Sequence, residues 1–353
     1  MSQPRVSICM PTLNSEAFLA PRLESIRRQT LRDWELVVVD SRSDDATLAM
    51  IESFARQGGV VRVYQGPRDG IYTNINRSIE YARSDYIYIA TSDDTMADDC
   101  LEKMAGALDR YPGCGLAHCG LRLIDARGQP VQDNWWPVRS TFARSADDWL
   151  DRDHLRKAPY DGLLHMLGET VYVSLTQLLI RRSLFHRVGM FRSDWGSISD
   201  FYWDMRAAMI TDTAHVGDTW ASWRVHETQA TAGAAIGRQP HADQTDDMIE
   251  RALADTRGDL PAGVQANLDA WRAEAKQLRQ FLVQLAAFRG RSRRWAYVIS
   301  ELLKGSVSAR RYVHGKFSRD LSLPERAPQV VASWLRAVGP EPIEGVEADR
   351  ALN

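Results

Sequence analysis

Two adjacent aspartates follow a strand-like pattern in the stretch YIYIATSDDTM, residues 86–96. The pattern's alternating aromatic and aliphatic residues are typical of a buried strand, and Asp93 and Asp94 come just after it. Neighbouring carboxylates repel each other and are costly to bury, unless a cation lies between them. Mg²⁺ and Mn²⁺ bind carboxylate oxygens and often share their shell with phosphate oxygens. The pair is therefore predicted to hold a metal; the alternative is that it caps the following helix.

Polar segments also follow three other predicted strands. RVSICM is followed by PTLN, WELVVVD ends in Asp40 and is followed by SRSDDAT, and VVRVY leads to GPRDGIYTNINRS. In an open parallel sheet, ligands bind beyond the carboxyl ends of the strands. These segments are therefore expected to gather with Asp93 and Asp94 at one edge of a sheet.

Helical patterns alternate with these strands and must position them. Such alternation is typical of an α/β fold, with a mostly parallel sheet flanked by helices. The predicted strands cover 5–10, 34–40, 60–64, 86–90, 115–120, 171–181 and 219–226, and the predicted helices cover 15–29, 46–56, 73–83, 98–110 and 200–210. From residue 241 on, long amphipathic patterns predict a helical extension. We place a domain boundary near 230–240, which gives a domain over 1–232 and a helical region over 233–353.

The composition excludes several classes of protein. The formal net charge of the 353 residues is −2, so overall charge gives no argument for a nucleic-acid partner. The four cysteines show no CxxC spacing, so they are expected to be reduced core thiols and not zinc ligands. No uncharged apolar run reaches the ~18–20 residues of a membrane span, and no signal-peptide pattern is present. The expectation is a cytoplasmic enzyme.

Taken in order, these segments resemble glycosyltransferase family 2, whose members are inverting enzymes with the Rossmann-like GT-A fold. VSICMPTLN resembles the family's opening strand and P-x-x-N turn, VVVDSRSDDAT its D-D-G-S-x-D-x-T segment, and DGIYTNINRS its G-I-Y-D-A-x-N-x-G pattern. TSDD resembles the N-S-D-D form of the D-x-D signature, with Thr91 where many members have the first Asp. Ser41 and Arg42 depart from the usual Asp-Gly.

Two later segments extend the resemblance to roughly residues 4–232. SDFYWDMR is similar to the family's E-D-x-x-L/W-x-x-R helix start, with Ser199 in place of the Glu and Asp200 retained. WRVHETQAT is similar to Y-R-x-H-x-x-Q/S-x-S/T, with Arg224 and His226 in place. Any one motif is weak, but six in the family's order identify the chain as a member.

The resemblance implies a reaction and its partners. A sugar would move from a nucleoside-diphosphate sugar, with UDP the expected nucleotide, to a hydroxyl of a saccharide or lipid-linked saccharide in bacterial surface polysaccharide or glycoconjugate synthesis. Mn²⁺ or Mg²⁺ would neutralise the diphosphate, held by Asp93, Asp94 and His226. The alternatives are that His226 is structural and that Arg224 only pairs with a carboxylate. The residues expected at the donor are Pro11, Thr12, Asn14, Asp40, Arg68, Asp69, Gly70, Asn76, Ser92 and Asp93.

Asp200 is the predicted base that takes the acceptor's proton. An ordinary aspartate has a pKa near ~3.9 and is a poor base at neutral pH. Burial among Trp195, Phe201 and Trp203 would raise that pKa. The alternative is that Ser199 and Asp200 only cap the helix.

Other segments carry open alternatives. Trp135 and Trp136 contact the acceptor or pack in a core, while core packing is expected for Trp220 and Trp223. The segment QATAGAAIGRQ, 229–239, is either a lid over the donor or a linker. Residues 289–319, in which Glu301 is the only acid, predict either peripheral contact with the inner face of a membrane or packing on the catalytic domain or a second subunit. The stripe over 264–288 could likewise serve a homo-oligomer.

Two rival functions are weighed. A sugar-nucleotide nucleotidyltransferase would need a basic, glycine-rich loop after the first strand, whereas PTLNSEAF carries no basic residue. A non-catalytic sugar- or nucleotide-binding module of the same fold would explain the departures at Thr91 and Ser199. Metal-dependent release of nucleoside diphosphate separates both rivals from a transferase.

Overall fold

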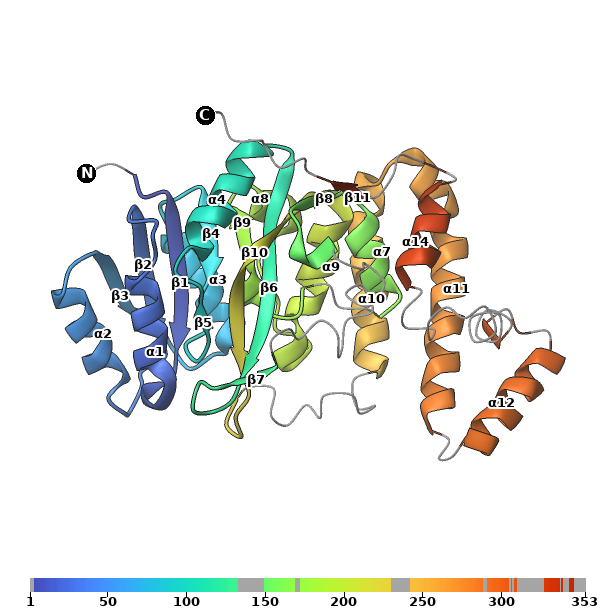
Figure 1. The fold of residues 1–353 in the computed structure, drawn as a ribbon, viewed down its shortest axis with the longest axis horizontal. Helices are drawn as coiled ribbons and strands as arrows, with labels where there is room; N and C mark the ends of the chain where they lie inside the picture. The colour runs from blue at the N-terminus through green and yellow to red at the C-terminus, as the bar shows by residue number, and fades with distance from the viewer. Residues whose placement is uncertain are drawn as a thin grey trace.

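The computed structural model describes residues 3–132, 149–168, 172–229, 242–287, 291–304, 306, 308–309, 327–336, 338 and 343–345. Within these residues one mixed sheet runs through the molecule (Figure 1). Its order is β11 (Ile343–Gly345), β8 (His154–Arg156), β10 (Asp212–Arg224), β6 (Cys114–Ile124), β9 (Leu178–Arg181), β4 (Tyr86–Ile89), β1 (Val6–Thr12), β2 (Trp34–Asp40) and β3 (Val60–Gln65), with β5 (Thr95–Met96) on β10 and β7 (Pro130–Gln132) on β6.

Most of the long strands point the same way. β4, β1, β2 and β3 pair in parallel, and β10 pairs in parallel with β6. β9 lies antiparallel between β4 and β6, so β6 shares the direction of β4. The predicted α/β class with a mostly parallel sheet is confirmed.

Helices cover both faces of the sheet, because successive side chains of a strand point to opposite faces. Along β4, Tyr86 and Tyr88 join one hydrophobic cluster, whereas Ile87 and Ile89 join the other. The first cluster packs under α1 (Glu16–Arg27), α2 (Thr47–Arg56) and α4 (Cys100–Arg110). The second packs under α3 (Ile71–Tyr81), α7 (Tyr160–Met166), α8 (Leu184–Val188) and α9 (Asp200–Ile210).

The C-terminal region is helical, as predicted. α10 (Ala242–Thr256), α11 (Ala262–Ala287), α12 (Arg291–Leu303) and α14 (Ala327–Arg336) lie at one end of the molecule, with α12 farthest out (Figure 1). Side chains of α10, α11 and α14 belong to the same hydrophobic cluster as α7 and α9. The boundary predicted near 230–240 lies almost wholly outside the described residues and stays a prediction. Among the helices described, none has the length and apolar character to cross a bilayer.

Three predicted strands differ from the observed ones by more than two residues in length. The strand expected over 171–181 is only β9, because Leu175–Gln177 forms a 3₁₀ turn in which Ser174 and Gln177 cap each other. The strand expected over 115–120 is part of the longer β6, and the strand expected over 219–226 is part of the longer β10 up to Arg224, with the last two residues beyond it. These two pair with each other at ten positions, so their ladder extends both strands beyond their apolar runs.

Candidate functional site

The carboxyl ends of parallel strands bring the predicted site residues to one edge of the sheet. Thr12 ends β1, Asp40 ends β2, Asp93 follows β4 and His226 follows β10. These strands share one direction. The side chains come from positions up to 214 residues apart in the sequence, and only the sheet topology brings them to one edge.

Asp40 lies at this edge, as the last residue of β2, and is 0% exposed. Its Oδ1 accepts hydrogen bonds from Thr12 Oγ1 (2.9 Å) and Ser43 Oγ (2.6 Å), and its Oδ2 accepts one from the Ser43 backbone N–H (2.9 Å). Asn14 joins the same loops, since its N–H donates to Ser43 Oγ (2.9 Å) and its side chain accepts from the Asp44 N–H (2.9 Å). Asp40 thus organises the loops after β1 and β2, and its contact with a nucleotide stays a prediction.

The loop between β3 and α3 carries three exposed predicted residues: Arg68, Asp69 and Gly70. Arg68 donates to the backbone carbonyl of Arg42 (2.7 Å), which fixes it over the loop after β2. Asp69 pairs with both terminal nitrogens of Arg77 (2.9 and 2.7 Å), and this pairing lowers the pKa of Asp69. The loop therefore lies beside the loop after β2.

Three other predicted donor residues contact the protein's own chain. Asn76 exchanges two hydrogen bonds with the backbone of Phe191 (2.8 and 3.0 Å), so it fastens α3 to the loop that precedes α9. Ser92 Oγ accepts a hydrogen bond from Ser15 Oγ (2.9 Å). Pro11 is buried within β1.

Asp93 and His226 meet across the edge. His226 Nε2 lies 3.0 Å from Asp93 Oδ2, and His226 Nδ1 lies 3.0 Å from Thr228 Oγ1. The imidazole packs on the ring of Phe18, with ring centres 4.2 Å apart. The Asp93 side chain is 25% exposed, so the carboxylate still faces solvent. Two of the three predicted metal ligands are thus adjacent.

Asp94 lies in a different environment from its neighbour. It is 1% exposed, and its oxygens accept hydrogen bonds from Thr91 Oγ1 (2.5 Å) and from the Arg224 backbone N–H (2.8 Å). Burial and then the charge of Asp93 raise the pKa of Asp94 to about 7, against the effect of these hydrogen bonds. The helix-cap alternative is wrong for this pair, because β5 follows it and α4 begins only at Cys100.

The donor set suits a hard divalent cation with an incomplete protein shell. Asp93 supplies a carboxylate and His226 an imidazole, while Mg²⁺ commonly takes one or two carboxylates and fills its shell with water and phosphate oxygens. Among the residues that the structure describes, no group of three His, Cys, Asp or Glu side chains is arranged to hold a metal. Each oxygen of Asp94 already accepts a hydrogen bond within the protein, and its predicted part as a third metal ligand stays a prediction.

Asp200 is the first residue of α9 and is half-buried. Its backbone N–H donates to Tyr72 Oη (3.2 Å), which in turn donates to the Ser197 carbonyl (3.0 Å). Burial raises the pKa of Asp200 to about 6, although the nearby Tyr72 hydroxyl and the Phe201 N–H act in the opposite direction. The direction matches the sequence expectation. Ser199, in the cap position, makes no side-chain cap bond to the helix.

The aromatic residues around Asp200 are packed as expected. Trp195 is 6% exposed and Trp203 is 0% exposed. The Trp195 indole donates to Asp247 of α10 (2.8 Å), and the Trp203 indole donates to the Gly189 carbonyl (2.8 Å). Both rings therefore shield the helix start from water and are not free to stack on a sugar.

Other predicted residues have mixed outcomes. The alternative that Arg224 only pairs with a carboxylate finds no ion pair among the described residues: the guanidinium donates to the backbone carbonyls of Asp93 (2.6 Å) and Asp125 (3.1 Å). Trp220 and Trp223 are half-buried and pack against the cluster under α1 and α4. Trp135, Trp136 and residues 230–239 lie outside the described residues.

Sequence reasoning missed two aromatic side chains at the edge. Tyr72 was noticed only as part of a motif, yet it contacts Asp200 from 128 residues away. Phe18 belongs to the apolar stripe of α1 and gave no signal of its contact with His226. Contacts between distant segments leave no local pattern.

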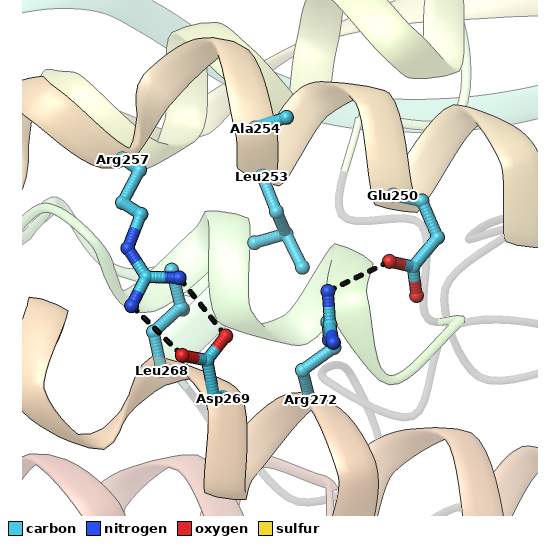
Figure 2. A pocket seen from close by; sticks show the side chains of 7 residues that line it. All are labelled: Glu250, Leu253, Ala254, Arg257, Leu268, Asp269 and Arg272. Carbon is cyan, nitrogen blue, oxygen red and sulfur yellow. Dashed lines mark hydrogen bonds and ion pairs between the residues drawn. The ribbon is translucent and has the colours of Figure 1, made fainter.

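A cavity of about 310 Å³ lies elsewhere, between α10 and α11 (Figure 2). Its charged lining consists of two ion pairs, Arg257 with Asp269 and Arg272 with Glu250. The charges balance, and no predicted site residue lines this cavity. Its lining residues lie between positions 250 and 272, after the strand-end segments in the sequence, and its charged side chains are paired with each other.

Comparisons with known proteins agree with the geometry. The family model described as glycosyl transferase family 2 matches residues 7–185. A PGL/p-HBAD biosynthesis glycosyltransferase from Mycobacterium bovis is 33% identical over 120 residues, which make up 33% of this chain and 47% of the relative. The EpsH protein of Bacillus subtilis is 32% identical over 233 residues, or 64% of this chain and 62% of that protein. The chain thus spans less than two thirds of the length of either relative.

Two solved structures share the fold. The mannosyltransferase PcManGT from Pyrobaculum calidifontis, in complex with GDP-Man and Mn2+, has a TM-score of 0.52 at 21% identity and covers 96% of this chain and 86% of its own. TarS from S. aureus, in complex with UDP-GlcNAc, has a TM-score of 0.51 at 16% identity, with 94% and 92% covered. At these identities the likeness concerns the fold alone, and the expected GT-A fold is confirmed.

Proposed function

The chain belongs to glycosyl transferase family 2, and from this premise we propose that it moves a sugar from a nucleoside-diphosphate sugar to a hydroxyl acceptor with inversion. The observation that carries the proposal is the contact of Asp93 with His226 at 3.0 Å, which joins the ends of β4 and β10. Residues 133 positions apart meet there in the pattern that the family resemblance implies for the diphosphate.

The roles of the side chains follow from their environments. Asp93 and His226 would hold Mn²⁺ or Mg²⁺, which neutralises the charge of a leaving diphosphate. Asp94 stabilises the segments that carry this pair, through its hydrogen bonds to Thr91 and to the Arg224 backbone. Asp200 takes the acceptor's proton, and its pKa of about 6 lies nearer to neutrality than that of an ordinary aspartate.

The donor is proposed to be a UDP-sugar, with GDP- and dTDP-sugars as the alternatives to screen. The two structural neighbours hold UDP-GlcNAc and GDP-Man, so the fold accommodates more than one nucleotide. The acceptor is proposed to be a saccharide or a lipid-linked saccharide of the cell surface.

The test is release of nucleoside diphosphate from a sugar-nucleotide panel with Mn²⁺, compared between the natural chain and Asp200→Asn. Loss of the base should lower kcat by about 10²–10⁴-fold, while a thermal shift with the donor survives. Asp194→Asn is the matched control, because Asp194 is exposed and pairs with Arg192. Donor binding without any release by the natural chain would favour the non-catalytic module, and unchanged rates in Asp200→Asn would remove the assigned base.

A cytoplasmic location at the inner face of a membrane is proposed on the basis of α12. Arg293, Ile299 and Leu303 are exposed on this helix, which stands at the outer end of the molecule (Figure 1). Exposed apolar side chains beside arginine are typical of a helix that lies on anionic lipid. Sedimentation with phosphatidylglycerol vesicles should be salt-sensitive and weakened by Ile299→Glu; a dimer unaffected by vesicles would favour the subunit interface.

A further inference from the structure

Asp204 is a buried acid that the proposed reaction leaves without a role. It lies on α9 and is 2% exposed, and among the residues that the structure describes its Oδ1 has no hydrogen-bond partner. A buried polar atom of this kind is normally paired, and leaving it unpaired costs stability. An ionised carboxylate in this position would be still more costly. The residue therefore calls for an explanation that packing alone does not give.

Asp204 lies one helical turn after Asp200. Side chains four residues apart on a helix are neighbours, with about 5–6 Å between their Cβ atoms. Both carboxyls act on Tyr72 of α3, whose pKa they help to raise. Burial first, and then the charge of Asp200, raise the pKa of Asp204 well above its usual range.

Within the described part of the chain, few other charged groups lie close enough to affect the protonation of Asp200 and Asp204. On α9 itself the next charge is Arg206, which packs over the ring of Tyr202. Titratable groups of the neighbouring helices contact other residues of α9: His165 of α7 packs on Phe201, Asp255 of α10 bonds to Tyr202, and Arg187 of α8 donates to the Ile210 carbonyl. Asp247 of α10 bonds to Trp195, before the helix begins.

We propose that Asp204 is a positioning residue for the base: it stays protonated beneath Asp200, so that the two carboxyls carry a single negative charge, which stays on Asp200. The inference rests on the proposed function. If Asp204 lost its proton, two carboxylates one turn apart would repel each other in surroundings of low dielectric constant. Asp200 would then be driven from its place at the Phe201 N–H, 3.0 Å away.

With two titrating carboxyls, kcat/KM is expected to change with pH in two regions, an acid limb and an alkaline limb. Activity rises on the acid side as Asp200 ionises, and falls on the alkaline side as Asp204 ionises. Asp204→Asn keeps a neutral side chain of the same shape at every pH. It should therefore retain the acid limb and lose the alkaline limb, so that its activity exceeds that of the natural chain by about tenfold for each pH unit above the alkaline pKa.

The matched control is Asp255→Asn, which makes the same change in a carboxyl that also contacts α9 but bonds to Tyr202. Its pH profile should match that of the natural chain. Asp204→Leu provides a second neutral side chain should Asp204→Asn not fold, and it too should lack the alkaline limb. Profiles of both Asp204 variants that superimpose on the natural one would overturn the proposal.

Thermal unfolding separates this inference from the proposed function. A protonated Asp204 in the folded state, opposed by an ordinary carboxyl in the unfolded chain, makes the natural protein lose stability as pH rises above ~3.8. The melting temperature of Asp204→Asn should therefore exceed the natural one by an amount that grows from pH 5 to pH 8. If the difference between the two melting temperatures stayed constant with pH, the proposal that Asp204 is protonated would be wrong. If the difference grew with pH but no sugar were transferred to any acceptor, only the proposed function would be wrong.

Discussion

At the scale of single residues, Asp93 and Asp94 show how neighbours acquire opposite roles. Asp93 is partly exposed and contacts His226, whereas Asp94 is 1% exposed and bonded to Thr91 and the Arg224 backbone. Removing a buried acceptor leaves its donors unpaired, while removing an exposed one does not. The first carboxylate is therefore open to a ligand, as the proposed function requires, and the second supports the strand ends.

We predict that Asp94→Ala lowers the free energy of unfolding by about 1–3 kcal/mol, because it leaves the Thr91 hydroxyl and the Arg224 N–H unpaired. Asp94→Asn should cost less, since its amide oxygen still accepts from Arg224 and its NH₂ can donate to Thr91 Oγ1. Asp93→Asn should leave stability nearly unchanged and remove metal-dependent activity. Urea denaturation measures all three, and equal losses for Asp93→Asn and Asp94→Ala would contradict this division.

At the scale of elements, the start of α3 depends on one glycine. Gly70 has φ 107° and ψ 158°, a conformation that is essentially confined to glycine. It turns the loop that carries Arg68 and Asp69 into the helix that carries Tyr72. The position of this loop relative to Tyr72, which contacts Asp200, therefore depends on the absence of a side chain at Gly70.

We predict that Gly70→Ala costs about 1–3 kcal/mol of stability through backbone strain alone, since an added Cβ would meet no atom within 4 Å. Gly106→Ala is the matched control. Gly106 lies inside α4 and has equally open space around an added Cβ, so alanine there should stabilise by about 0.5–1 kcal/mol. Thermal melts of the two variants should shift in opposite directions; a shared direction would contradict the role of φ at Gly70.

Sequence patterns predicted the elements where burial alone decides them. WELVVVD matches β2 residue for residue, because every side chain of that strand is buried. The patterns failed where pairing with another strand sets the length of an element: β10 extends back to Asp212 because β6 pairs with it. The site shows the same division, since the strand-end acids were predictable, whereas the bonds of Asn76 to Phe191 and of Tyr72 to Asp200 join segments with no common pattern.

At the scale of the whole molecule, the helical extension and the catalytic part share one hydrophobic cluster. Trp195, next to the candidate base, bonds to Asp247 of α10 (2.8 Å), and Arg279 of α11 bonds to Asp246 (2.6 Å). Met248 and Trp271 pack in the same cluster as Trp203. The helices therefore stabilise the surroundings of Asp200, whatever partner α12 contacts.

A buried polar network at the other end of the sheet links β6, β8 and β10. His215 Nε2 donates to the Leu150 carbonyl (2.8 Å), and His215 Nδ1 lies 2.9 Å from His118 Nδ1. His118 Nε2 then accepts from Gln177 Nε2 (3.2 Å). From β8, Arg156 Nη2 lies 3.4 Å from His118 Nδ1 and Arg156 Nη1 lies 3.0 Å from His154 Nε2. Burial, and then electrostatic interaction with Arg156 and the neighbouring histidines, lower the pKa of His118 and His215 well below the usual range.

This network predicts that the molecule loses stability in mild acid. The unfolded chain binds protons on these histidines below about pH 6.5, whereas the folded chain does not, so each histidine lowers the free energy of unfolding by about 1.36 kcal/mol per pH unit below that value. His215→Gln can keep a donor and an acceptor but cannot be protonated, so its stability should fall less steeply between pH 7.5 and 5. His186→Gln, at an exposed position on α8, should follow the natural chain. Urea denaturation across this range measures the slopes; if His215→Gln and the natural chain lost stability in parallel, the buried imidazoles would not be the source of the acid sensitivity.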